Sequence, residues 1–413
     1  MRLLFLTQVA PAYRTDFYDR HPDLVSASFA DQYAAVMRDA FAWVGAWSGA
    51  MGRAGHDVLE VVANASPMQR AWAREHGVRP TGPSARLSVA EAQIRAFRPD
   101  VVLVDDMRNF SADWLRALRE RVPEIRCIVA HVGSPWHDVD TIRACDAVLC
   151  VSRAYTEMMR RHGCRSHFFR HAFNRDILRN LPGVARPSGA ITFCGNFLRG
   201  AGAHDAREQL FEHLVGRVPV EIHAPQYGKS RLADFADTMA RRALYASCGV
   251  LAAAGVSRTA LRRLPVIGKA ATWSSLPLFQ TNARLRPYMR PALYGSPMYN
   301  ALASASVTVH VHGSAAGDEA VAMRLFEATG VGGCLLTDRQ SDLATVFAPD
   351  TEVVAFGSPA EALERAQWLL EHEEARNEIA AAGQRRTLRE HTFDDRVAQF
   401  EEVTALAVGG RIA

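Results

Sequence analysis

Short, continuously apolar runs alternate with helix-like segments along this chain, and this alternation restricts the fold more than any other feature. The first half contains the runs "RLLFLT", "DVLEVVA", "DVVLVDD", "RCIVAHV", "DAVLCVS" and "SHFFRHAF". Runs of about four to eight apolar residues are typical of strands that are buried on both faces of a parallel sheet. The segments between them, such as "SADWLRALRERVP" with Ser111 as N-cap, have helical patterns. Repeated βα units of this kind predict a doubly wound α/β sheet.

The same alternation begins again in the second half. After "NLPGVARPSGA", which suits a linker, come "ITFCGNF", "PVEIHAP", "SVTVHVHG", "GCLLTD" and "EVVAF". Because 413 residues exceed what one core usually serves, we expect two Rossmann-like domains that face each other across a cleft. They are residues 1–185 and 186–385. The last helical pattern, 386–413, either stays with the second domain or crosses back onto the first.

Composition narrows the class of protein. A net charge of +4 with 22% charged and 48% hydrophobic residues indicates a folded globular chain and gives no reason to expect a nucleic-acid partner. The seven cysteines are odd in number and scattered, which suits buried thiols in a reducing compartment. The N-terminal apolar run is too short for a signal peptide, and no uninterrupted apolar stretch is long enough to span a membrane. We therefore expect a cytoplasmic protein.

A basic segment, about 225–290, interrupts the βα rhythm. It holds eleven Lys and Arg residues and two Asp residues, a net charge of +9, so the rest of the chain carries −5. One interpretation is a helical insertion with a solvated basic face. The alternative is a surface for an anionic acceptor or for peripheral contact with an anionic membrane, at the inner face of the cell membrane.

The stretch "GDEAVAMRLFEATGVGGCLLTD" places Glu319 and Glu327 eight residues apart with Arg324 between them. We expect a helix to begin at Glu319, after a loop of small residues, so that its first backbone N–H groups can hold a phosphate. Eight helical residues rise about 12 Å, so the two carboxylates contact different parts of one extended ligand. A nucleoside diphosphate sugar fits, with the sugar near Glu319, the diphosphate at the helix start and the ribose diol at Glu327.

A structural interpretation of the same residues is also open. Arg324 and Glu327 are three apart and can form an ion pair on a helix surface, worth a few tenths of a kcal/mol. Glu319 can be a carboxylate that the helix dipole favours.

The spacing of the two glutamates, followed by "EATGVGGCLL", resembles the signature of group 1 glycosyltransferases of the GT-B fold. The stretches "ALYGSPMYNALASASVTVHVHG" and "AAAGQRRTLREHTFDDRV" are similar to the subset related to the spore-maturation protein CgeB. The resemblance implies that the donor sugar nucleotide binds mainly to the second domain, with Arg324 at the diphosphate and Glu327 at the ribose. It also implies retention of the anomeric configuration. Relatives often have an asparagine where this chain has Ala322, which leaves the identity of the donor open.

Further candidate donor-binding residues follow the first strand of the second domain. A glycine at Gly195 lets the backbone approach a phosphate, with Asn196 beside it. Arg199 and Arg207 can clamp a pyrophosphate, or they are solvent-facing charges.

His131 ends a strand of the first domain and is a candidate general base or hydrogen-bond donor near the transferred sugar, unless it is a structural histidine. Asp138 is the alternative acid at this position. Asp105 and Asp106 are interpreted as loop acids. His310 and His312 share one face of a strand but lack further ligands at metal spacing, so we predict no metal site.

The sequence therefore predicts an enzyme, a hexosyltransferase-like glycosyltransferase that moves a sugar from a nucleoside diphosphate donor to an unidentified hydroxyl acceptor, with no cofactor. The acceptor is a glycan, a lipid, a protein or a small molecule. No Walker loop, GxSxG elbow or GxGxxG fingerprint follows a strand. Two alternatives remain: a nucleotide-sugar epimerase on the same fold, and a non-catalytic scaffold that binds sugar nucleotides or polysaccharides.

Overall fold

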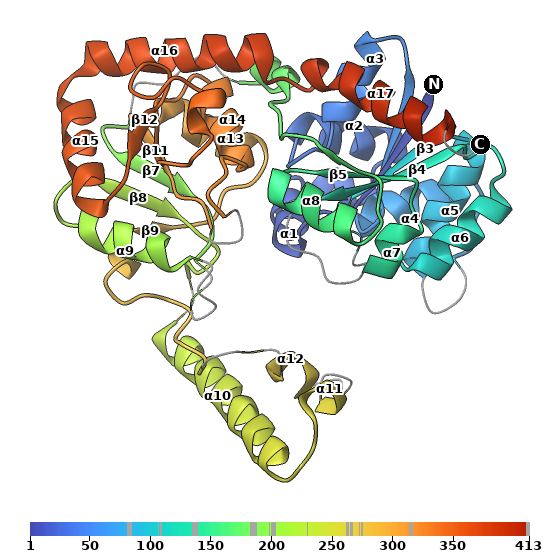
Figure 1. Ribbon diagram of the computed structural model, residues 1–413, viewed down its shortest axis with the longest axis horizontal. Coiled ribbons are helices and arrows are strands. Elements are labelled where there is room, and N and C mark those ends of the chain that lie inside the picture. Colours follow the sequence, from blue (N-terminus) through green and yellow to red (C-terminus); the bar gives the residue numbers. More distant parts are fainter. Residues whose placement is uncertain are drawn as a thin grey trace.

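Two parallel sheets, one in each half of the chain, form the scaffold of the protein (Figure 1). The first sheet has the strand order β2-β1-β3-β4-β5-β6 and the second has the order β12-β11-β10-β7-β8-β9. This computed structural model describes all residues except 81–84, 106, 108–109, 134–138, 182–187, 198, 200–203, 229, 262–263, 265–266, 272, 274–275, 314–316 and 410–413. The predicted pair of Rossmann-like domains is confirmed.

The first domain is built of strands β1 (Arg2–Thr7), β2 (Asp57–Val62), β3 (Val101–Val104), β4 (Cys127–Val132), β5 (Ala147–Cys150) and β6 (Ser166–Phe168). Its helices are α1 (Pro11–Arg20), α2 (Phe29–Asp39), α3 (Ala46–Arg53), α4 (Ser66–Glu75), α5 (Ala85–Phe97), α6 (Ala112–Arg121), α7 (Val139–Arg143) and α8 (Arg153–Arg161). Short 3₁₀ turns lie at Pro22–Ser26 and Arg175–Arg179.

The second domain contains strands β7 (Ile191–Cys194), β8 (Val220–His223), β9 (Met289–Arg290), β10 (Val307–His310), β11 (Leu335–Asp338) and β12 (Val354–Phe356). Its helices are α9 (Asp205–Leu214), α10 (Arg231–Ala253), α11 (Arg258–Leu261), α12 (Ile267–Ala270), α13 (Ser296–Ser304), α14 (Met323–Gly330), α15 (Pro359–Glu371) and α16 (Glu373–Glu390), and α17 (Asp394–Gly409) follows. Further 3₁₀ turns lie at Arg286–Tyr288 and Leu343–Thr345.

The apolar runs form strands because both faces of each sheet are covered. Every residue of β3 and β4 is buried, as expected for central strands between two helical layers. The predicted N-cap is also present, since the Ser111 hydroxyl accepts a hydrogen bond from the Trp114 N–H at the start of α6.

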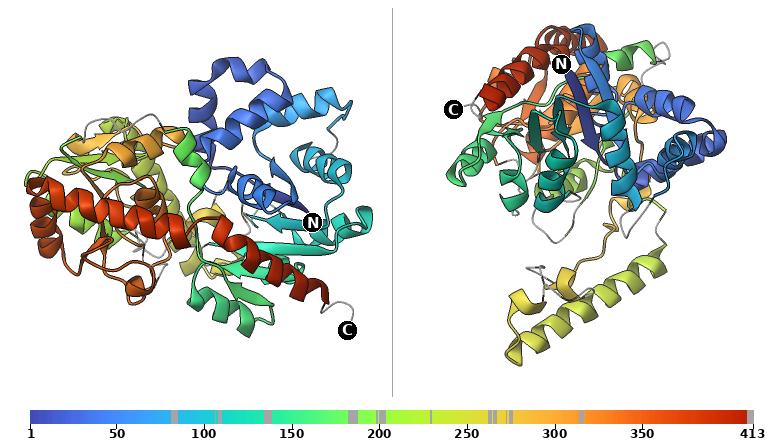
Figure 2. Two further views of the ribbon diagram at one scale, coloured as in Figure 1. Left: turned by 90° about the horizontal axis from the view of Figure 1, so that it is seen from above. Right: turned by 90° about the vertical axis from the view of Figure 1, so that its right-hand side faces the viewer.

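The C-terminal helix crosses back to the first domain, which the sequence left open. Helices α16 and α17 run along one side of both domains (Figure 2). Phe400 of α17 packs against Trp47 of α3, with ring centroids 4.9 Å apart. Arg53 of α3 forms an ion pair with Asp394 at the start of α17. The end of the chain thereby ties the second domain to the first.

The basic segment 225–290, here called the insertion, follows β8 and ends with β9. Its helices α10, α11 and α12 project away from the second sheet (Figure 1). They have a small apolar cluster of their own, which includes Cys248, Leu261 and Ala271.

Candidate functional site

A cavity of about 300 Å³ lies where the two domains meet. We call it the interdomain cavity, and its lining consists of Phe41, Ala42, Phe193, Cys194, Gly195, Arg207, Met298, His310, Ala322, Met323, Arg324 and Glu327. The carboxyl ends of β7 and β10 and the start of α14 meet there. In a doubly wound sheet this is the edge at which ligands bind.

Arg324 and Glu327 form the charged centre of the cavity. They make the i, i+3 ion pair that the structural interpretation predicts, with Nη1 and Oε2 2.9 Å apart. However, the pair lies in the cavity lining and Glu327 is buried. The Tyr299 hydroxyl lies 2.8 Å from the Ala40 carbonyl oxygen and 3.3 Å from Glu327 Oε1. One hydroxyl proton cannot serve both acceptors at once, so Glu327 keeps capacity for another donor.

The neighbouring Tyr299 stays protonated. Burial, and then the negative charge of Glu327, raise the pKa of its hydroxyl well above the usual value. The carboxylate therefore faces a neutral hydroxyl and the Arg324 cation, and a ligand diol could supply further donors to it.

Arg207 adds a second buried cation. Its guanidinium donates to the carbonyl oxygens of Asn196 and Val311, at 2.6 Å each. Its Nε has no hydrogen-bond partner among the residues that the structure describes. Burial lowers the pKa of Arg207 to about 10, so the group is still charged at neutral pH.

Gly195 lies at the same edge of the sheet, in the cavity lining. A Cβ at this position would lie 2.5 Å from Cζ of Phe193, so any larger residue would force that ring to move. The absence of a side chain at this position therefore makes room for the Phe193 ring, and both residues belong to the cavity lining. The predicted approach of a phosphate to Gly195 stays a prediction.

His310 at the end of β10 also has an unused polar atom. Its Nε2 is buried and lacks a partner within the described part of the chain. Burial, and then the nearby His312 and arginines, lower the pKa of His310 well below its usual value. The imidazole is therefore neutral, and it can donate a hydrogen bond to a ligand or accept one.

The helix next to the cavity begins later than predicted. The expectation of a helix from Glu319 is wrong, because α14 starts at Met323 with Ala322 as its N-cap. Ala322 offers no side-chain cap, so the first N–H groups of α14 have no acceptor from that residue. The positive end of the helix dipole therefore lies in the cavity lining, where it favours an anion.

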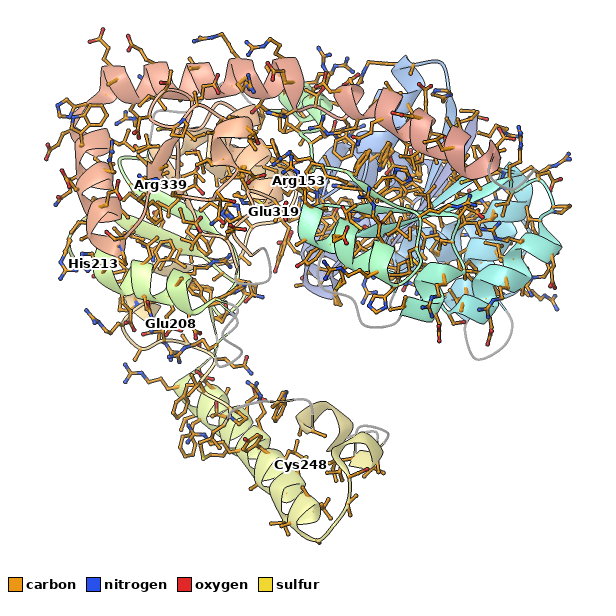
Figure 3. The ribbon with its side chains drawn as sticks, viewed as in Figure 1. Arg153, Glu208, His213, Cys248, Glu319 and Arg339 are labelled. Atoms are coloured by element: carbon orange, nitrogen blue, oxygen red, sulfur yellow. The ribbon has the colours of Figure 1, made fainter. Side chains whose placement is uncertain are left out.

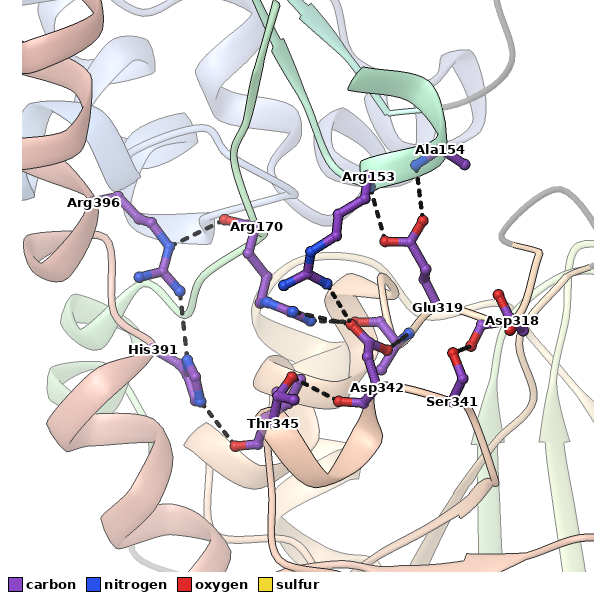
Figure 4. A network of polar contacts seen from close by, with 12 residues as sticks. Arg153, Ala154, Arg170, Asp318, Glu319, Ser341, Asp342, Thr345, His391 and Arg396 are labelled. Carbon is purple, nitrogen blue, oxygen red and sulfur yellow. Dashed lines mark hydrogen bonds and ion pairs between the residues drawn. The ribbon is translucent and has the colours of Figure 1, made fainter. Parts of the chain in front are cut away.

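Glu319 lies outside the cavity lining, at the domain interface. Its side chain lies next to Arg153 (Figure 3). Its Oε2 accepts the Arg153 N–H at 2.8 Å and its Oε1 accepts the Ala154 N–H at 2.9 Å (Figure 4). Both oxygens are thus used by the first turn of α8 in the first domain. The charge sits at a helix N-terminus, as the dipole argument predicts, but the helix belongs to the other domain.

A second carboxylate strengthens this junction. Asp342 accepts hydrogen bonds from the Ala320 N–H at 2.6 Å and from Arg170 at 3.1 Å, and lies 3.4 Å from Arg153 (Figure 4). Burial alone would raise the pKa of Asp342, but these donors outweigh it and lower the pKa.

The first domain makes a matching contact with the second. Buried Asp39, the last residue of α2, accepts the Ser296 N–H at 3.1 Å at the start of α13. It is also paired with Arg20 at 3.0 Å. Each domain therefore supplies a carboxylate to a helix N-terminus of the other. Sequence reasoning missed Asp39, because nothing local marks a cap that acts on a helix more than 250 residues away.

His131 lies in the first domain with an unforeseen partner. Its Nδ1 is 3.0 Å from Asp105 Oδ1, and its ring centroid is 3.9 Å from that of Trp43. Its Nε2 has no partner among the described residues. Asp105, interpreted from the sequence as a loop acid, is the group that orients His131. The sequence could have indicated this pair, since the two residues lie at the ends of the neighbouring strands β3 and β4.

The predicted residues Asp138 and Asp106 lie outside the described residues.

Like His131, two other predicted residues lie outside the cavity lining. Asn196 offers its carbonyl to Arg207 and its Oδ1 to Gln226. Arg199 pairs with Glu208 and donates to the Phe279 carbonyl, at the base of the insertion. Their roles toward a donor stay predictions.

The part of the chain with described side chains shows no group of three or more His, Cys, Asp or Glu residues that could hold a metal ion. Metal independence nevertheless stays a prediction. In the same part of the chain, no helix combines the length and the apolar composition needed to cross a bilayer.

Comparison with known proteins supports the fold. A family described as glycosyl transferase-like matches residues 207–402. No curated protein matches the sequence significantly. Among solved structures, HepE from Anabaena in complex with UDP-glucose is similar with a TM-score of 0.52, at 10% identity, over 97% of this chain and 99% of that one.

Two further structures have the same architecture. Sucrose-phosphate synthase from Thermosynechococcus elongatus has a TM-score of 0.50 and 11% identity, covering 99% of this chain and 100% of its own. A glycosyltransferase from Rickettsia africae has a TM-score of 0.51 and 9% identity, covering 98% of each chain. At such identities the likeness concerns the fold alone, and this chain has the GT-B fold of two facing Rossmann-like domains.

Proposed function

We propose that the protein is a glycosyltransferase that uses a nucleoside diphosphate sugar and transfers the sugar to a hydroxyl acceptor. The observation that carries the proposal is the Arg324–Glu327 ion pair in the interdomain cavity, whose carboxylate is buried and which lies next to the uncapped start of α14. Cationic groups beside a carboxylate with free capacity match a diphosphate joined to a ribose diol. The family match and the UDP-glucose complex of HepE support the same reading.

In this proposal the cationic and anionic groups of the cavity bind different parts of the donor. Arg324, Arg207 and the first N–H groups of α14 bind the diphosphate, and Glu327 accepts hydrogen bonds from the ribose. As the bond to the sugar breaks, negative charge grows on the departing diphosphate. Fixed cations and N–H dipoles in a buried site stabilise that charge more strongly than water does.

His131 is proposed as the group of the first domain that acts near the transferred sugar. Asp105 holds its Nδ1 side, which leaves Nε2 to accept a proton from the acceptor hydroxyl or to donate a hydrogen bond. Both carboxylate oxygens of Glu319 accept N–H groups of α8. We therefore propose that Glu319 positions the two domains and does not contact the sugar. Retention of configuration, which the family resemblance implies, stays part of the proposal.

The seven cysteines are all unpaired, and this supports our placement of the protein in a reducing compartment, the cytoplasm.

The first test is a thermal-shift titration with UDP, GDP and ADP, because a ligand that binds only the folded state raises its melting temperature. We expect at least one diphosphate to stabilise the protein. Glu327→Ala should remove the shift, while Glu378→Ala, an exposed acid on α16, should keep it. The absence of a shift with every nucleotide would contradict the proposal.

The second test follows the donor by mass spectrometry in the presence of cell extract. Free nucleoside diphosphate together with a glycosylated product indicates transfer. Conversion of the donor into a second sugar nucleotide without a product would indicate an epimerase. Nucleotide binding without any turnover would indicate the non-catalytic binding scaffold.

A further inference from the structure

The insertion exposes apolar side chains that a soluble domain would normally cover. Of the thirteen large hydrophobic residues that are exposed among those described, nine lie between residues 227 and 279. On α10, Leu232 is 82% exposed, Phe235 53% and Val250 69%. Such a concentration of exposed apolar side chains marks an interaction surface.

These three side chains share one face of α10. Leu232 and Val250 are eighteen residues apart, which is about five turns, so they point in the same direction. Phe235 lies one turn from Leu232. The exposed positions between Leu232 and Val250 are otherwise Ala, Ser and Gly, and none of them is charged. The outward face of α10 between Leu232 and Val250 is thus an uncharged apolar stripe.

The acidic residues of the insertion are turned inward. Asp234 is buried and accepts the N–H groups of Gln280 and Thr281 at 2.9 and 3.1 Å. Asp237 pairs with the Gln280 side chain. They are the only two acids against eleven Lys and Arg residues in 225–290. The insertion therefore combines exposed apolar side chains with a sequence of net positive charge.

We propose that the insertion docks on an anionic membrane surface, with α10 lying in the interface. Exposed apolar residues combined with a net charge of +9 match acyl chains below anionic headgroups. A second copy of the chain fits less well, because two insertions of equal charge repel each other. A nucleic acid would pair with the cations, but it would leave Leu232, Phe235 and Val250 exposed to water.

The place where the insertion leaves the second sheet indicates which class of acceptor receives the sugar. The insertion leaves the second sheet at the carboxyl end of β8, which pairs with β7. Gly195 follows β7 at that same edge, and His310 ends β10 there. Docking through the insertion thus brings the cavity edge of the sheet toward the lipid. Resting on the proposed transferase activity, the inference names the acceptor class: a hydroxyl carried by a membrane-borne lipid.

Docking is tested by co-sedimentation with vesicles, which needs no donor. The full chain should sediment with phosphatidylcholine–phosphatidylglycerol vesicles, much less with phosphatidylcholine alone, and less as salt is added, because salt screens the charge. The triple variant Leu232→Gln, Phe235→Gln, Val250→Gln should bind at least about tenfold more weakly, since each buried apolar side chain contributes to partitioning. The control Leu406→Gln changes an exposed leucine of α17, which is 58% exposed, and should bind like the unchanged chain.

Several outcomes would overturn docking: no sedimentation, equal sedimentation with neutral vesicles, or an unaffected triple variant. A dimer in light scattering that the triple variant abolishes would assign the stripe to self-association instead. The UDP thermal shift of the triple variant should be unchanged, so failure of docking and failure of nucleotide binding are separate results.

The acceptor class is tested with a radiolabelled donor and membrane extract. Label that partitions into the organic phase, and that falls in the triple variant, supports a lipid acceptor. Label that remains in a water-soluble product would contradict the proposal of a lipid acceptor. Membrane docking is decided by the sedimentation experiment alone.

Discussion

The interdomain cavity and the junction beside it are both rich in buried charge, but they use it differently. At the junction, Glu319 and Asp342 each accept hydrogen bonds from more than one donor. In the cavity, Arg207 Nε and His310 Nε2 are buried without a partner among the described residues. An unsatisfied buried polar group costs about 1–3 kcal/mol. Such a cost is expected where a ligand supplies the missing partner. The junction therefore holds the domains together, whereas the cavity keeps buried polar atoms that the proposed ligand would satisfy.

The largest effect should come from Arg324→Gln. The change removes a cation from the proposed diphosphate site and leaves buried Glu327 without its ion-pair partner. We expect UDP affinity to fall at least about 100-fold, close to 3 kcal/mol, because truncating one partner of a buried charge pair costs about 2–5 kcal/mol. Isothermal titration calorimetry with UDP measures this.

The double variant Arg324→Gln, Glu327→Gln separates a structural ion pair from a ligand contact. It removes the unpaired charge, so the melting temperature should recover toward that of the unchanged protein. UDP affinity should remain low. Recovery of both quantities would mean that the pair only supports the fold.

The next largest effect should come from Glu319→Ala at the junction. The loss of two charge-assisted hydrogen bonds to α8 should lower the free energy of unfolding by about 2 kcal/mol. UDP affinity should change less than about twofold, since the cavity is untouched. Urea denaturation and calorimetry give the two numbers. Unchanged stability with a collapse of turnover would instead restore Glu319 to contact with the sugar.

Asp39→Ala is the matched change on the other side of the junction. It removes the acceptor of the Ser296 N–H and leaves Arg20 without this partner. We expect the same pattern as for Glu319→Ala, with lost stability and kept nucleotide affinity.

The sequence predicted the parts of this comparison that depend on local pattern. "RLLFLT" is β1 to the residue, since continuous apolar runs leave few alternatives to a buried parallel strand. Arg324, Glu327, Gly195 and Arg207 all lie in the cavity lining, and the residues around them mark a strand end or a helix. Their contacts with a donor stay predictions.

What the sequence could not predict depends on contacts between distant segments. The four residues from Glu319 to Ala322 suit a helix, but the Glu319 side chain is engaged by α8 and the Ala320 N–H by Asp342. These tertiary bonds hold the segment out of the helix, so α14 starts late. Tertiary context overrides helix propensity in this way elsewhere too.

A smaller effect should appear as a pH dependence at His391. This residue lies between the end of α16 and the start of α17, near the junction (Figure 4). Burial lowers its pKa to about 4, with Arg396, Arg386 and Arg170 adding to the effect. The folded state therefore binds a proton less readily than the unfolded chain. Stability is complete above about pH 6.5 and falls as the pH drops toward 4.

His391→Gln tests this contribution. At about pH 5.5 the histidine should cost about 1 kcal/mol of stability relative to neutral pH. Glutamine can keep a hydrogen bond to the Val346 carbonyl, which His391 Nε2 approaches to 3.0 Å. The drop in unfolding free energy between about pH 7.5 and about pH 5.5 should be smaller in the variant by that amount. Equal drops would assign the acid sensitivity to other groups.

The smallest effect should come from Ala322, the uncapped start of α14. Ala322→Asn supplies a capping side chain and should stabilise the protein by up to about 1 kcal/mol. Ala322→Asp should stabilise the free protein similarly, but its charge competes with a diphosphate for the same N–H groups. We expect UDP affinity to fall about fivefold with Asp and less with Asn, because the helix start can serve one anion at a time. Melting temperatures with and without UDP measure both effects. If Asp and Asn left the nucleotide shift equal, the diphosphate would not lie at the start of α14, and the cavity's anion site would rest on Arg207 and Arg324 alone.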